Sequence, residues 1–204
     1  MSTGLPRQLL RIQYEEAAEA YLRGIERRIA AGLDTKVGSV ASIFISRWDV
    51  AVAGKVPDNL RDKLGIAIAG RAYKAYVDLL ASPRWQAIVK AGYNPQRLLW
   101  ASTGTKDPRA SDILYIKALA APNTVNTMPE PTLKAFADHG ELGQVMPRDG
   151  GDCEDVIAEF AKAGVDVDAL AAQLQAEGAK AFSDSWNELM KVIESKSMVL
   201  TQGA

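Results

Sequence analysis

Two segments of the chain combine hydroxyl side chains with one basic residue a few positions further on. One is Ser-Ile-Phe-Ile-Ser-Arg at residues 42–47, and the other is Ala-Ser-Thr-Gly-Thr-Lys at residues 101–106. Arginine offers a rigid fork of donors to a phosphate and lysine offers a compact charge, while hydroxyls and loop amides complete the cradle. The two segments therefore predict binding of a small phosphorylated substrate, with Arg47 and Lys106 as its cations.

A second interpretation of both cations stays open at this stage. Each has an acid close by in the sequence, and Arg47 could pair with Asp49 or another acid, and Lys106 with Asp107, as ordinary loop charges. A nucleotide site is not expected, because Ser-Thr-Gly-Thr-Lys lacks the first glycine and the terminal Lys-Ser/Thr of a P-loop.

We expect structural roles for the other reactive side chains. The single cysteine, Cys153, lies among acids, which oppose thiolate formation. The single histidine, His139, ends a predicted helix before Gly140, where imidazole meets the helix dipole. With one Cys and one His we expect no metal site, and we expect no cofactor. We expect core or interface positions for Trp48, Trp85, Trp100 and Trp186, and a solvated helix face for Asp152, Glu154, Asp155, Glu159, Asp166 and Asp168.

The elements that must position these residues alternate between helix and strand. Apolar periodicity and breaker residues predict helices at 13–32, 58–81 (capped by Asp58), 82–92, 112–120 and 131–139, strands at 37–46, 97–102 and 123–127, and helices from 152 to 196 with breaks at Gly164 and Gly178. The alternation is typical of an α/β fold with a parallel sheet, in which functional side chains gather at the carboxyl ends of the strands. The apolar run at 37–46 suits a strand buried on both faces.

The composition limits the classes of function. Apolar residues make up 48% of the 204, and 24 basic residues balance 25 acidic ones, so the chain can bury a core as a single domain, residues 1–204. The balance gives no basic field for nucleic acid and no polybasic membrane anchor, and no apolar run is long enough to span a bilayer. We see no signal peptide, and one cysteine favours a reducing, cytoplasmic setting.

Three motifs resemble transaldolases, in the same order along the chain. They are Ser-Val-Ala-Ser-Ile-Phe-Ile-Ser-Arg-Trp-Asp at 39–49, Pro-Gln-Arg-Leu-Leu-Trp-Ala-Ser-Thr-Gly-Thr-Lys-Asp-Pro at 95–108, and Ala-Pro-Asn-Thr-Val-Asn-Thr-Met-Pro-Glu at 121–130. The likeness is to the actinobacterial type and covers about residues 13 to 196. It implies a partial (β/α)8 TIM barrel, made of the last three strands, roughly the sixth to the eighth, in residues 13–151, followed by a tail of C-terminal helices at 152–196.

The resemblance also implies an activity. The family moves a dihydroxyacetone unit between sugar phosphates of the sedoheptulose 7-phosphate and fructose 6-phosphate type, in the pentose phosphate pathway, through a Schiff base on a fourth-strand lysine. By this likeness Ser42, Phe44, Arg47 and Ser102 match substrate-binding positions. Arg47 would hold the phosphate and Lys106 would assist.

The chain also departs from the family pattern. Residues 1–12 are atypical, and the Schiff-base lysine has no counterpart; Lys117 falls in the helix before the last strand and is not expected to replace it. We therefore expect no catalytic lysine and no turnover from these residues alone. Three origins stay open: part of a transaldolase, which also occurs fused to glucose-6-phosphate isomerase; a non-catalytic paralogue that binds sugar phosphate or a partner chain; or a half-barrel that closes as a homo-oligomer.

Overall fold

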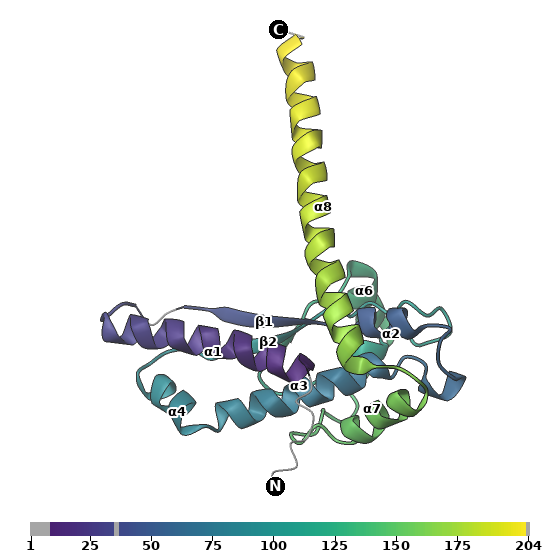
Figure 1. The fold of residues 1–204 in the computed structure, drawn as a ribbon, viewed down its shortest axis with the longest axis horizontal. Coiled ribbons are helices and arrows are strands. Elements are labelled where there is room, and N and C mark those ends of the chain that lie inside the picture. The colour runs from purple at the N-terminus through teal and green to yellow at the C-terminus, as the bar shows by residue number, and fades with distance from the viewer. Residues whose placement is uncertain (1–8, 35–36, 203–204) are drawn as a thin grey trace. The chain divides into compact units, whose positions relative to one another are not determined.

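The fold is that of a computed structural model, which describes residues 9–34 and 37–202 (Figure 1). The chain divides into two compact units, Met1–Val167 and Asp168–Ala204. Most of the atypical segment 1–12, residues 1–8, lies outside the described residues.

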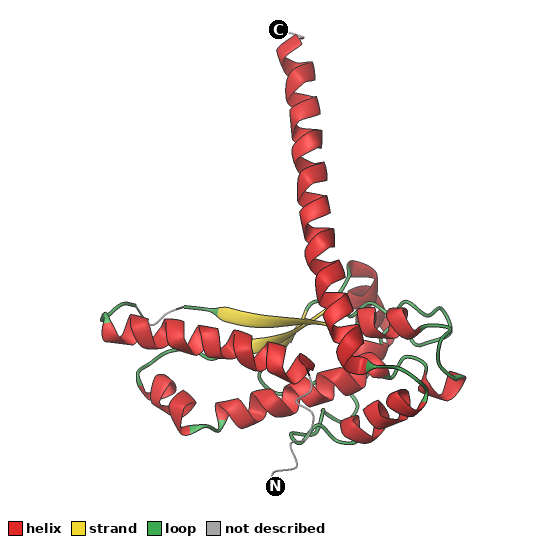
Figure 2. Cartoon of the chain, in the orientation of Figure 1, coloured by secondary structure: helices red, strands yellow, loops and turns green. Residues whose placement is uncertain are grey.

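The first unit contains a small parallel sheet (Figure 2). Its strands are β1 (Ser39–Phe44), β2 (Gln96–Ala101) and β3 (Thr124–Asn126), in the spatial order β1-β2-β3. All three predicted strands are confirmed; β1 and β3 are shorter than expected at both ends, and β2 is shifted by one residue. The register places Ser42 opposite Leu99, and Leu99 opposite Val125. The three carboxyl ends therefore meet at one edge of the sheet.

Helices connect the strands in the predicted order. The helices of the first unit are α1 (Leu9–Ala30), α2 (Ser46–Val52), the 3-10 turn η1 (Asp58–Leu60), α3 (Leu64–Leu80), α4 (Pro83–Lys90), α5 (Leu114–Ala118), α6 (Glu130–His139) and α7 (Cys153–Lys162). A two-turn helix that was not predicted, α2, begins directly after β1. Its seven residues are too few to show a helical period against the apolar run that precedes them.

The core lies on one face of the sheet. Ile43 and Ile45 of the first strand segment and Leu98 and Trp100 of β2 pack there against α1, α3 and α5, as part of a cluster that also contains Tyr73. Figure 1 shows α1 and α3 on this same side of the sheet.

The opposite face of the sheet, which we term the open face, carries Val40, Ser42, Phe44, Leu99 and Val125. Val40 is 43% exposed, Ser42 is exposed, and the other three are half-buried. The expectation of a strand buried on both faces is therefore wrong for the described residues. Among the helices of the first unit, α1, α3 and α5 contribute to the core cluster on the other face.

This one-sided arrangement distinguishes between two parallel architectures. A doubly wound sheet has helices on both faces, whereas a (β/α)8 barrel keeps them outside a sheet that curls around an inner face. Sequential parallel neighbours with helices on one face match the second case. The fold is α/β and consistent with part of a TIM-barrel-like domain.

The helix predicted over 58–81 is wrong at its start. Asp62 has a left-handed backbone (φ 55°), which interrupts the helix between η1 and α3. Asp58 does not cap α3. The carboxylate of Asp49, distant in sequence, accepts hydrogen bonds from the backbone N–H groups of Leu64 (2.9 Å) and Gly65 (3.2 Å). A cap supplied from another element leaves no local sequence signal.

The C-terminal helices differ from expectation at one of two glycines. Gly164, with φ of 87°, ends the α7 region as predicted. Gly178 does not interrupt the helix, and α8 (Val167–Gln202) continues through this residue as one helix. Glycine inside a helix costs only about 1 kcal/mol against alanine, and the alanines and long polar side chains around it favour the helix.

One acid of the predicted solvated face has a specific partner. Glu154 of α7 receives two hydrogen bonds from the guanidinium of Arg71 in α3, at 2.8 and 2.7 Å. Arg71 is only 4% exposed, and this pair joins the two helices.

Candidate functional site

The carboxyl ends of β1 and β2 are joined beyond the last residue of each strand. The backbone N–H of Ile45 donates to Ala101 O (2.9 Å), and that of Ser46 donates to Ser102 O (3.1 Å). The hydroxyls of Ser46 and Ser102 lie 2.9 Å apart and share a hydrogen bond. Ser102 has a left-handed backbone (φ 57°), a strained state for a residue with a Cβ, held here by these contacts.

A similar contact joins β2 to β3. The hydroxyl oxygen of Thr103, which is fully buried, lies 2.8 Å from Asn126 Oδ1 and 2.8 Å from the backbone oxygen of Thr127. The N–H of Thr127 in turn donates to Trp100 O. The sequence analysis named neither Ser46 nor Thr103 as a site residue. Their signal was their place beside named hydroxyls at two strand ends.

Arg47 lies in the first turn of α2, directly after β1. Its guanidinium carbon is 4.0 Å from the centre of the Phe44 ring, a cation–π contact that holds the group against the ring face. Among the described residues Arg47 makes no ion pair. Two of the predicted site residues, Phe44 and Arg47, are thus brought into direct contact.

Asp49, the acid expected to neutralise Arg47 in the alternative interpretation, is occupied elsewhere. It is 6% exposed, caps α3, and accepts a hydrogen bond from the hydroxyl of Tyr115 at 2.7 Å. Burial raises the pKa of Asp49 above its ordinary value, while the Tyr115 hydroxyl and the N–H groups of Gly65 and Leu64 oppose that rise. The first half of the alternative interpretation is therefore wrong.

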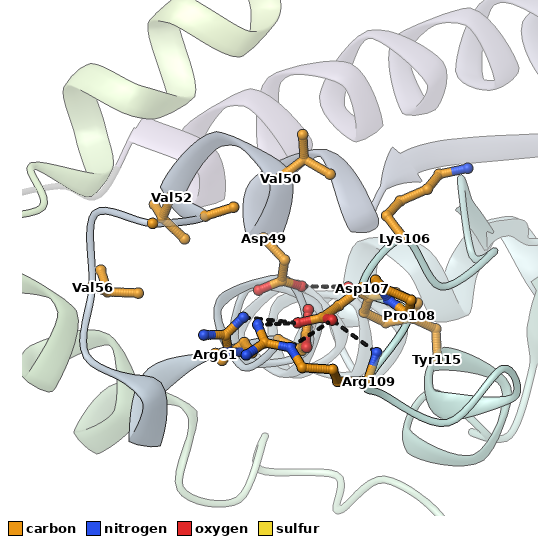
Figure 3. Close-up of a pocket in the computed structure, with 13 residues that line it drawn as sticks. Asp49, Val50, Val52, Val56, Arg61, Lys106, Asp107, Pro108, Arg109 and Tyr115 are labelled. Carbon is orange, nitrogen blue, oxygen red and sulfur yellow. Dashed lines mark hydrogen bonds and ion pairs between the residues drawn. The ribbon is translucent and has the colours of Figure 1, made fainter.

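Asp107, the acid beside Lys106, is also taken by other donors. One oxygen of its carboxylate lies 3.0 Å from Arg61 Nη1 and 3.1 Å from Arg109 Nη2, and the other accepts the backbone N–H of Arg109 at 2.9 Å. In the described part of the chain, Lys106 makes no ion pair and is exposed. Figure 3 shows its side chain directed away from the Asp107 cluster.

A pocket of ≈ 400 Å³ lies beside this loop, between the end of α2, the η1 segment and the loop before α5. Asp49, Arg61, Lys106, Asp107 and Tyr115 line it (Figure 3). Lys106 is the only predicted site residue among those that line it; Ser42, Phe44, Arg47 and Ser102 do not. Of the five residues, Phe44 and Arg47 are in contact, Ser42 lies within β1, Ser102 directly follows β2, and Lys106 lies on the loop after it.

Other candidates occupy structural settings. Cys153 is buried, and burial together with the Glu154 carboxylate raises the pKa of its thiol. His139 ends α6 as predicted; its ring nitrogens lie 3.1 Å from Asp112 Oδ1 and 3.3 Å from Asp138 Oδ2, and these acids raise its pKa. Lys117 lies in α5, the helix expected for it. Trp48, Trp85 and Trp100 are buried, and Trp186 is 62% exposed.

No helix in the described ranges has a stretch both long and apolar enough to cross a membrane.

Comparisons with a family model and with individual proteins give the same family. A family model described as transaldolase/fructose-6-phosphate aldolase matches residues 11–193. A transaldolase of Parafrankia sp. (strain EAN1pec) is 44% identical over 193 residues, which cover 90% of this chain and 52% of that protein. A transaldolase of Neisseria meningitidis (serogroup C, strain FAM18) is 41% identical over 191 residues, covering 93% and 54% respectively. The chain thus spans about half the length of the curated relatives it matches.

Proposed function

Because this chain belongs to the transaldolase/fructose-6-phosphate aldolase family, we propose that it binds the phosphate group of a sugar phosphate at the carboxyl ends of β1 and β2. Arg47 and Lys106 are the proposed phosphate ligands. Ser42, Phe44 and Ser102 are proposed to line the site for the rest of the sugar. The reaction proposed for the whole protein is the transfer of a dihydroxyacetone unit through a Schiff base.

One observation carries the proposal: among the described residues neither cation has a carboxylate partner, although each has an aspartate close by in sequence. Asp49 is taken up by the N-terminus of α3 and Tyr115, and Asp107 by Arg61 and Arg109. A cation left without an ion pair keeps its full charge for a ligand. A phosphate accepts charge-assisted hydrogen bonds from both kinds of group.

The contact with Phe44 supports the same role for Arg47. A guanidinium resting on an aromatic face keeps its N–H edge available in the plane of the group. The side chain also loses less rotational freedom on binding than a solvated arginine would. Arg47 is thereby suited to two parallel hydrogen bonds with phosphate oxygens.

The residues that form the imine are proposed to lie on other strands of the family barrel. We assign β1, β2 and β3 to roughly its sixth, seventh and eighth strands, and the Schiff-base lysine to an earlier strand that these residues do not match. On this view the chain contributes the phosphate end of the site, and does not form the imine alone.

Titration calorimetry with inorganic phosphate and with fructose 6-phosphate tests the proposal on the 204-residue chain. Arg47→Met and Lys106→Met should each weaken binding by about ten- to a hundredfold, because a hydrogen bond to a charged group contributes about 1.5–3 kcal/mol. Lys90→Met, at the exposed end of α4, is the matched control and should bind as the parent does. Unchanged affinity in both site variants would overturn the proposal.

A further inference from the structure

Asp107 is placed so that it could cancel the charge of its neighbour Lys106. A carboxylate and an ammonium on adjacent residues of one loop can reach each other by rotation of the lysine side chain. An internal ion pair of this kind would compete with any phosphate for Lys106. What keeps the two groups apart therefore bears on the proposed site.

The carboxylate of Asp107 is held by two arginines. Arg61 comes from the segment after η1 and reaches Asp107 Oδ2 at 3.0 Å. Arg109 folds back over two residues, with Nη2 3.1 Å from Oδ2 and Nε 3.2 Å from Oδ1. The Asp107 side chain is only 13% exposed, so these contacts are partly shielded from water.

The two arginines differ in what they restrain. Arg109 is 63% exposed and moves with the same loop, so it adds charge but no link to another element. Arg61 is 37% exposed, lies 46 residues away, and also pairs with Asp58 of η1. Arg61 therefore ties the loop to η1.

The other side of Lys106 is also anchored. The hydroxyl of Thr105 donates to Ser111 O at 2.8 Å. With Thr105 and Asp107 both held, the loop backbone at Lys106 is restrained while its side chain extends in the opposite direction from the carboxylate (Figure 3). Loop and side chain together leave the ammonium group available.

We propose that Arg61 is a positioning residue for the phosphate site: by binding Asp107 it prevents that carboxylate from neutralising Lys106. This inference rests on the proposed function, because it assigns Arg61 a role only if Lys106 binds phosphate. It concerns the charge of Asp107, so it makes a prediction that a purely structural role of Arg61 does not.

The test measures inorganic phosphate affinity of the 204-residue chain by calorimetry. Arg61→Met removes the one of the two arginines that ties Asp107 to η1, and it should weaken binding by about fivefold, the scale of a partly exposed ion pair. The double variant Arg61→Met/Asp107→Asn should recover the parent affinity, because the competing charge is gone. Arg61→Lys, which retains a cation for Asp107, should stay close to the parent.

The outcomes separate the two proposals. If Lys106→Met weakens binding but Arg61→Met does not, the positioning role is wrong and the phosphate site stands. If the double variant binds no better than Arg61→Met, the loss comes from a disturbed loop, and the inference is again overturned. If Lys106→Met binds like the parent, the role proposed for Lys106 fails, and the inference fails with it.

Discussion

Asp49 shows at the scale of one residue how a buried acid can be stabilised without a basic partner. Its carboxylate accepts two backbone N–H groups at the start of α3 and the hydroxyl of Tyr115. The positive end of the helix dipole adds to these bonds. Desolvation still prevails, since the pKa of Asp49 is raised and not lowered. Asp49 does not pair with Arg47, because three neutral donors already satisfy its carboxylate.

This raised pKa predicts a pH dependence of stability. The folded chain holds the Asp49 proton more tightly than the unfolded chain, whose carboxyl titrates near 3.8. The free energy of unfolding should therefore fall as the pH rises above that value, until the folded carboxyl has also ionised. In Asp49→Asn this contribution disappears.

Urea unfolding at a series of pH values from about 3 to 7 measures the difference between the parent and Asp49→Asn. Tyr115→Phe removes a hydrogen bond that lowers the pKa of Asp49, so it should extend the falling range to higher pH. Identical pH slopes in the parent and the asparagine variant would contradict this account.

Among the elements, α3 begins in close contact with its surroundings. A Cβ added at Gly65 would lie 2.6 Å from Asp49 Oδ2 and 2.8 Å from Ile45 O. The missing side chain lets the start of α3 approach the end of the β1 segment, the point from which Arg47 projects. A glycine in the first turn of a helix is explained by this approach and not by helix propensity.

Gly65→Ala should accordingly destabilise the chain by about 1–3 kcal/mol, because backbone or the capped carboxylate must shift. Gly24→Ala is the matched control: Gly24 lies within α1 and a Cβ there meets nothing within 4 Å. That change should stabilise by about 0.5–1 kcal/mol, as alanine favours the helix. Denaturant midpoints measure both, and a stabilising Gly65→Ala would refute the close-packing argument.

At the scale of the whole molecule, apolar surface remains exposed in each of the two units. In the first unit Val40 is exposed on the open face of the sheet, and the outer edges of β1 and β3 have no partner strand among the described residues. In the second unit, taken by itself, α8 exposes Trp186, Leu189 and Ile193 on one side. Surfaces of this kind promote association.

We expect the 204-residue chain to associate as its concentration rises. Val40→Lys should reduce this association, because it places a charge on the open face beside a free strand edge. Val89→Lys on α4 is the control, since Val40 and Val89 are both 43% exposed. Light scattering coupled to size-exclusion chromatography measures the mass. Equal association in both variants, or a parent chain that stays monomeric, would contradict the expectation.

The sequence by itself determined the order of the elements and the place of the candidate site. Apolar periodicity and glycine or proline breaks located all three strands and most helices, because those signals come from residues close together in the chain. Hydroxyls and cations at two strand ends predicted where a phosphate would bind, since parallel strands end at a common edge.

Only the tertiary structure decided which charges stay available. Whether Asp49 pairs with Arg47, or Asp107 with Lys106, depends on donors 15 to 66 residues away, namely the start of α3, Arg61 and Tyr115. The same holds for the cap of α3 and for the open face of the sheet. Local sequence carries no record of these contacts, because they form only when distant segments pack together and compete for the same carboxylate.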